Sequence, residues 1–254
     1  MAHKLYEIRP RSIVYLFSGG KDSSLALLKT RDVVRKYAEE HKAKVYILYV
    51  LIPGNTHPLN TYASATVMYW HRKHYGFEPM FRCVDRVFQE FMAKYGLQKG
   101  PGRWCFIMFK DRVFRDVERR LPRPQLHIDG MSPRDSKHRR EIITSEFQYI
   151  ETKDGTQFWA WHPLINFDGD PLDELRKHPE FRPIVKLYEH FGDSMNCVVC
   201  PYKTTSKYIK HNEVEPLDII SDYVNTVMRS KHFRKVFNKM RTINLTNFME
   251  KVAE

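Results

Sequence analysis

The sequence has no long hydrophobic run, few cysteines, and fewer acidic than basic residues. No stretch approaches the roughly 18 consecutive apolar residues of a membrane helix, and the mean hydropathy is −0.54. Residues 1–10 are polar and lack the apolar core of a signal peptide. We therefore expect a soluble, cytoplasmic protein without membrane contact. With 254 residues, 42% of them apolar and 28% charged, the composition is globular and excludes both a disulfide-stapled miniprotein and intrinsic disorder.

The shortage of acidic residues leaves a strong positive charge. Lys and Arg number 42 against 30 Asp and Glu, a formal net charge of +12, and the pI is near 9.5. Nucleotides, polyphosphates or a nucleic acid backbone would offset this charge, although a solvated basic surface is the alternative. A helical tail is predicted from about residue 216, and its cations either follow phosphates or simply face water. These cations are Arg229, Lys231, Arg234, Lys235, Lys239 and Arg241.

Short apolar runs alternate with helical patterns, which predicts parallel strands joined by crossover helices. The strand candidates are residues 12–17, 44–51, 78–84 and 125–129, and the helix candidates are residues 23–40 and 62–74. Alternation over residues 147–161 around Asp154-Gly155 predicts an antiparallel hairpin. We predict an α/β fold: a doubly wound, mostly parallel sheet with a small antiparallel hairpin and a helical C-terminal region. A boundary near 165 would separate a nucleotide-binding domain (1–165) from the remainder (166–254), unless the two form one continuous domain.

A glycine turn joins the first predicted strand to the first predicted helix, in the segment Ser18-Gly19-Gly20-Lys21-Asp22-Ser23-Ser24. Its backbone N–H groups lie at a helix N-terminus, where the dipole and the unpaired donors favour phosphate. It is not the common P-loop, because Tyr15 stands where that motif needs glycine and Asp22 stands where it needs Ser or Thr. The alternative is a purely structural turn with a capping serine.

The SGGKDS segment directly after an apolar strand resembles the PP-loop of the ATP pyrophosphatases, which grip the pyrophosphate of ATP and cleave between the α and β phosphates. Further segments, in matching order and spacing over about residues 12–205, resemble the phosphoadenosine phosphosulfate (PAPS) reductase family. These segments are Gly54-Asn55-Thr56-His57-Pro58-Leu59-Asn60-Thr61, Gly102-Arg103-Trp104-Cys105 with Lys110, Gly130 with Asp135-Ser136 and Arg139, Pro163-Leu164-Ile165-Asn166-Phe167, Lys186-Leu187-Tyr188, and Cys197-Val198-Val199-Cys200-Pro201.

The resemblance, with the chemistry of the residues, implies a site for ATP or a related adenine nucleotide such as APS or PAPS. Lys21 would offset charge on the pyrophosphate leaving group, and Asp22 would hold Mg²⁺ or orient the loop. Cys105 is the candidate catalytic thiol. Arg134 is either a ligand or surface charge. The candidate nucleotide-binding residues are Ser18, Gly19, Gly20, Lys21, Asp22, Ser23, Ser24, Gly54, Arg103, Lys110, Gly130, Arg134 and Arg139.

The chain departs from the family pattern at several positions. Ser132 stands where the family usually has Arg, Phe167 replaces Trp, and Ile52-Pro53 replaces an acidic residue. PAPS reductases carry a nucleophilic cysteine in a C-terminal tail, but no cysteine follows Cys200. Sulfonucleotide reduction in its usual form is therefore disfavoured.

Cys197 and Cys200 are spaced so that both thiolates can bind one metal ion. Cys105, which the resemblance places near the active site, would be a third ligand, and Cys83 or an exogenous group could be a fourth. Three soft ligands suit a 4Fe-4S cluster with one open iron or a zinc ion completed by histidine; the alternative is a redox pair plus a buried thiol. Cys83 falls in a predicted strand and is expected to be a small buried hydrophobe.

Other histidines and aromatic residues suit ordinary structural roles. Surface or capping positions are expected for His57, His71, His74 and His138, and core positions for Phe158, Trp159 and Trp161.

The favoured hypothesis is an enzyme that binds ATP and adenylates an acceptor oxygen, after which sulfur carried by the cysteine or cluster site displaces AMP. The acceptor could be RNA or DNA, and a second copy of the chain or a sulfur-donor protein could be a partner. One alternative is a sulfonucleotide reductase whose nucleotide is the substrate. Another is a non-catalytic nucleotide- and metal-binding module of a larger complex.

Overall fold

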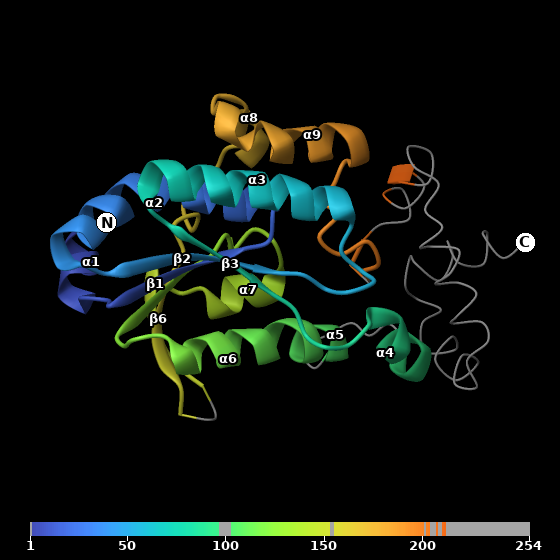
Figure 1. Ribbon diagram of the computed structural model, residues 1–254, viewed down its shortest axis with the longest axis horizontal. Helices are drawn as coiled ribbons and strands as arrows, with labels where there is room; N and C mark the ends of the chain where they lie inside the picture. Colours follow the sequence, from blue (N-terminus) through green and yellow to red (C-terminus); the bar gives the residue numbers. More distant parts are fainter. Residues whose placement is uncertain are drawn as a thin grey trace, which may run out of the picture.

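The computed structural model describes residues 2–96, 103–152, 155–200, 202–203, 207 and 210–211. Within them, one six-stranded sheet has the order β3-β2-β1-β4-β6-β5 (Figure 1). The strands are β1 (Ser12–Phe17), β2 (Lys44–Val50), β3 (Glu78–Arg82), β4 (Gln125–Ile128), β5 (Phe147–Glu151) and β6 (Gln157–Trp161). The β5–β6 pair is antiparallel and the other strand pairs are parallel. The predicted hairpin is confirmed and lies at one edge of the sheet.

The central strand β1 is buried along nearly its whole length, as its apolar sequence predicts. Ser12 pairs with Lys44 of β2 on one side and with Gln125 of β4 on the other. The chain then runs outward from β1 through β2 to β3, and returns to the opposite side of β1 as β4. The loops that follow β1 and β4 therefore diverge, which opens a crevice where α/β sheets bind ligands.

Helices cover both faces of the sheet (Figure 1). One face carries α2 (Lys21–His41) and α3 (Pro58–Tyr75), and the other carries α6 (Arg112–Arg120). An outer layer, α8 (Pro171–Arg176) and α9 (Arg182–Phe191), packs on α2 and α3. The remaining elements are α1 (Ala2–Ile8), α4 (Phe88–Tyr95), α5 (Trp104–Phe106), the π-helical turn η1 (Ile107–Asp111), α7 (Lys137–Ile142) and the 3-10 turn η2 (Pro179–Phe181).

This arrangement confirms an α/β fold with a mostly parallel sheet, and it is compatible with a doubly wound topology. The predicted C-terminal helix and its basic residues lie outside the described residues, as do Asp154 and Pro201. The domain boundary near 165 stays a prediction.

Two expectations for single residues are wrong. Cys83 is exposed and follows β3 instead of lying buried within it, because β3 forms an edge of the sheet. His71 is fully buried, whereas a surface or capping position was expected. In contrast, His57 caps α3 as expected, since its Nδ1 accepts a hydrogen bond from Leu59 N at 3.2 Å. Trp161 is a fully buried core residue, also as expected.

His71 belongs to a buried charged cluster that joins three elements. The Arg31 guanidinium of α2 bonds the Glu180 carboxylate of η2 at 2.5 Å. His71 of α3 lies beside them, with its Nε2 3.4 Å from an Arg31 nitrogen and its Nδ1 2.8 Å from Val67 O. This cluster fastens η2, and through it the outer layer, to the helices that cover the sheet.

Candidate functional site

The turn after β1 adopts a conformation that requires glycine. Gly19 has a φ of +68°, and a Cβ atom at this position would lie 2.1 Å from Ser64 Oγ of α3. In the loop after β4, a Cβ atom on Gly130 would lie 2.5 Å from the Ser23 backbone nitrogen. The loop after β4 therefore packs directly against the first turn of α2.

Hydrogen bonds hold the turn in shape. Ser18 Oγ accepts from Gly20 N at 3.3 Å, and Ser23 Oγ donates to Gly20 O at 3.0 Å. Lys21 N donates to the Tyr188 hydroxyl at 3.0 Å, which connects the turn to α9. Gly20 is the N-cap of α2 and has no side chain to cap it. The positive end of a 21-residue helix dipole thus faces the turn.

A cavity of about 560 Å³ opens beside this turn, at the crevice between the ends of β1 and β4. It brings together predicted residues from four separate segments: the turn after β1, the α5–η1 region, the loop after β4, and α7. The predicted residues that line it are Ser18, Gly20, Asp22, Ser23, Arg103, Lys110, Gly130 and Arg139. Its farther walls are largely apolar and include Phe114, Ile143, Ile150 and Phe158.

Other predicted site residues lie outside the lining of this cavity, including Gly19 and the buried Ser24. Lys21 Nζ pairs with Asp22 Oδ1 at 2.9 Å. Gly54 follows β2, with a φ of +77° and with Gln89 against it. Arg134 lies 3.6 Å from the exposed Asp168 carboxylate and is itself half exposed.

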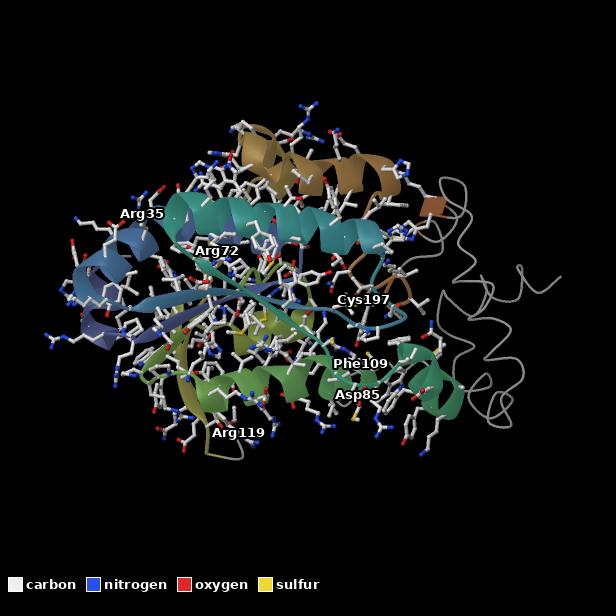
Figure 2. All side chains as sticks on the ribbon, viewed as in Figure 1. Arg35, Arg72, Asp85, Phe109, Arg119 and Cys197 are labelled. Atoms are coloured by element: carbon white, nitrogen blue, oxygen red, sulfur yellow. The ribbon has the colours of Figure 1, made fainter. Side chains whose placement is uncertain are left out.

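The segment after α9 docks onto the loop after β2. Asn55 makes three of the contacts: its O accepts from Val198 N at 2.8 Å, its Oδ1 accepts from Val199 N at 2.8 Å, and its Nδ2 donates to Val199 O at 3.1 Å. Asn60 Nδ2 donates to Ser194 O at 2.7 Å. These bonds hold the Cys197–Cys200 pair near the ends of the strands, where Figure 2 labels Cys197.

Cys105, Cys197 and Cys200 lie close enough for their charges to affect one another, and none of them forms a disulfide. Burial and then the Cys197 charge raise the pKa of Cys105, against the opposing effect of Arg103 and Lys110. The same two causes raise the pKa of Cys200 to about 11. Nevertheless, no three His, Cys, Asp or Glu side chains of the described residues are arranged to hold a metal ion. The three cysteines therefore do not fit a preformed metal site, and their assignment as ligands stays a prediction.

Sequence reasoning missed two carboxylate–imidazole pairs that line the cavity, Asp129 with His162 and Glu118 with His127. Asp129 carried a usable signal, because it ends a buried strand at the edge where α/β sheets gather ligand-binding residues. His162 carried none, since its place depends on β6 pairing with β4.

No protein-family model matches the chain, and a search of curated proteins finds no match. Among the described residues, no helix is both long enough and apolar enough to cross a membrane.

Proposed function

We propose that the chain is a PP-loop enzyme of the PAPS reductase family that binds ATP, transfers its adenylyl group to an acceptor oxygen and supports sulfur transfer to that acceptor. The observation that carries the proposal is the convergence of four separate segments on one cavity. The glycine turn lines this cavity together with Arg103, Lys110 and Arg139. A helix N-terminus with three nearby cations suits a polyphosphate.

The residues of the turn would interact with the phosphates in three ways: by hydrogen bonds, by charge and through a metal ion. Backbone N–H groups of the turn would bind phosphate oxygens. The Lys21 ammonium would leave its ion pair with Asp22 and offset the negative charge that develops on the pyrophosphate. Mg²⁺ usually binds to one or two carboxylates plus the phosphates themselves, so Asp22 in the cavity lining suits an ion that arrives with the nucleotide. When bound, the ion would neutralise phosphate charge.

Cys105 is the thiol that the proposal assigns to sulfur transfer. Arg103 and Lys110 both favour its thiolate, and both line the nucleotide cavity. The +12 charge supports a nucleic acid as the acceptor. Sulfonucleotide reduction, with Cys105 as the attacking thiol, is the alternative.

Calorimetry with ATP and Mg²⁺ tests the nucleotide site. Lys21→Ala should weaken ATP binding by about 10-fold or more, because a charged contact is lost. Gly20→Val should also weaken ATP binding, because its side chain would keep phosphate away from the backbone of the turn. Thermal stability should change little, because the turn contributes few apolar contacts. Lys36→Ala, an exposed lysine on the same helix, is the matched control. Wild-type affinity in both turn variants would overturn the nucleotide assignment.

The thiol site needs separate measurements. Metal content and the visible spectrum of anaerobically purified protein test the predicted metal, which Cys105→Ser, Cys197→Ser and Cys200→Ser should each reduce, with Cys83→Ser as the control. Thiol-dependent release of sulfite from adenylyl sulfate or its 3′-phosphate, without nucleic acid binding, would favour the reductase instead.

A further inference from the structure

Asp129 and His162 form a hydrogen-bonded pair in the wall of the nucleotide cavity. His162 Nδ1 lies 3.0 Å from Asp129 Oδ1, and the side chains are 3% and 10% exposed, respectively. Backbone bonds fix both partners: Asp129 N donates to Trp161 O at 3.2 Å, and His162 N donates to Glu146 O at 2.7 Å. The pair is therefore built into adjacent strand ends.

The carboxylate determines which imidazole nitrogen carries the proton. Asp129 Oδ1 already accepts from Met131 N at 2.9 Å, and a carboxylate oxygen can only accept. His162 must therefore donate from Nδ1, so that in the neutral imidazole Nε2 carries the lone pair. Because His162 lines the cavity and its Nδ1 is engaged, Nε2 is the atom that can act on a bound molecule.

The neighbouring histidine is not equivalent. His127 Nδ1 is 3.8 Å from Glu118 Oε1, too far for a hydrogen bond. Phe158 stacks on the His127 ring with 4.3 Å between centroids. His127 Nε2 is buried without a hydrogen-bond partner among the described residues. The His127 ring is thus buried in the cavity wall. The Asp129 carboxylate, in contrast, holds the His162 ring in an arrangement that suits proton transfer.

The geometry points to His162 as the general base of the reaction, with Asp129 as the residue that positions it. This inference rests on the proposed adenylyl transfer. The acceptor oxygen forms a bond to the α-phosphorus, the bond from that phosphorus to the bridging oxygen breaks, and pyrophosphate leaves with the electron pair. The proton of the acceptor passes to His162 Nε2. No other reactant is needed.

The cavity also restricts the acceptor. Beyond the glycine turn its walls are mostly apolar, with Phe114 on α6 opposite the strands and with Ile150 and Phe158 on the hairpin. Glu118 and Asp129 add carboxylates to the same lining, beside the cations that would bind the phosphates. The reacting end of the acceptor is therefore an oxygen with a removable proton, carried on a compact apolar or aromatic group such as a nucleic acid base.

Water is the simplest such acceptor, so the test measures AMP and pyrophosphate formed from ATP and Mg²⁺ alone. His162→Gln should lower this rate by about 100-fold or more, as loss of a general base does, while calorimetric ATP affinity stays within about threefold. Added imidazole should partly restore His162→Ala, an effect that a structural role would not produce. His138→Gln, an exposed histidine on α7, is the control.

Asp129→Asn gives a second test, because its amide oxygen can keep both hydrogen bonds while the negative charge is lost. It should lower the rate less than Asp129→Ala, and the ¹⁵N spectrum of His162 should keep the Nδ1-protonated form in Asp129→Asn. Two outcomes would overturn the inference and leave the ATP site intact. One is a His162→Gln rate near that of the wild type, and the other is a wild type that binds ATP but forms no AMP. Failure of the wild type to bind ATP would instead overturn the proposed function.

Discussion

Acidification should destabilise the fold through His71, because its buried site favours the neutral imidazole. Burial, with a smaller effect of the Arg31 charge, lowers the pKa of His71 to about 4 from 6.5. Protonation would place a second positive charge beside the guanidinium, since His71 Nε2 is 3.4 Å from Arg31. In the unfolded chain the same imidazole binds a proton near its ordinary pKa.

The sign and size follow from this difference. The folded-state pKa is the lower one, so the full contribution of His71 is present above pH 6.5 and is lost as the pH falls toward 4. Each pH unit in that window removes up to about 1.4 kcal/mol, so His71 alone should remove about 2 kcal/mol from the free energy of unfolding by pH 5. His127 and His211, whose pKa values burial also lowers to about 4, act in the same direction.

Urea unfolding followed by circular dichroism at pH 7.5, 6.5, 5.5 and 5.0 measures this loss. His71→Gln should be less stable at pH 7.5, because it loses buried contacts, but its stability should fall by about 2 kcal/mol less than that of the wild type by pH 5. His74→Gln, an exposed neighbour on the same helix, should keep the wild-type pH dependence. Parallel pH curves for His71→Gln and the wild type would show that His71 titrates normally and would refute the reasoning.

Three further predictions concern the turn, the thiols and the partner. Gly19→Ala should lower the free energy of unfolding by about 2 kcal/mol or more because of its positive φ and the Ser64 contact; Gly20→Ala, at φ −89°, should cost less, and equal losses would contradict this. Iodoacetamide at pH 7.5 should label exposed Cys83 at least about tenfold faster than Cys200, as peptide mass spectrometry would show. Filter binding to mixed RNA and DNA should weaken at least about tenfold between low and physiological salt, and retention of neither nucleic acid at low salt would contradict it. Binding should fall further in the joint variant of Arg234, Lys235 and Lys239.

Much of the sheet could be predicted because its strands are local apolar runs. β1 begins and ends at the predicted residues, and β2 and β4 differ from their predictions by one residue at the C-terminal end. The error at Cys83 has a physical cause: an apolar run does not reveal whether its strand is central or at an edge, and β3 is an edge strand.

The candidate site was predictable only where its residues are close in sequence or belong to a motif. The glycine turn can be recognised in the sequence because it lies between a predicted strand and a predicted helix. His71 and His162 do not, because their surroundings come from distant segments: Glu180 approaches Arg31 across 149 positions, and Asp129 meets His162 across 33. Local patterns carry no information about such pairings.

If the turn binds phosphate as proposed, the bond from Lys21 N to the Tyr188 hydroxyl couples phosphate binding to the position of α9. A backbone N–H is a single donor, so a phosphate oxygen that takes it must displace the phenol, a group whose pKa burial already raises. By thermodynamic reciprocity, whatever tightens α9 against the turn weakens phosphate binding by the same factor, and phosphate loosens α9 in return. The segment that follows α9 carries Cys197 and Cys200. Phosphate binding would therefore change the position of these thiols through the loss of one hydrogen bond.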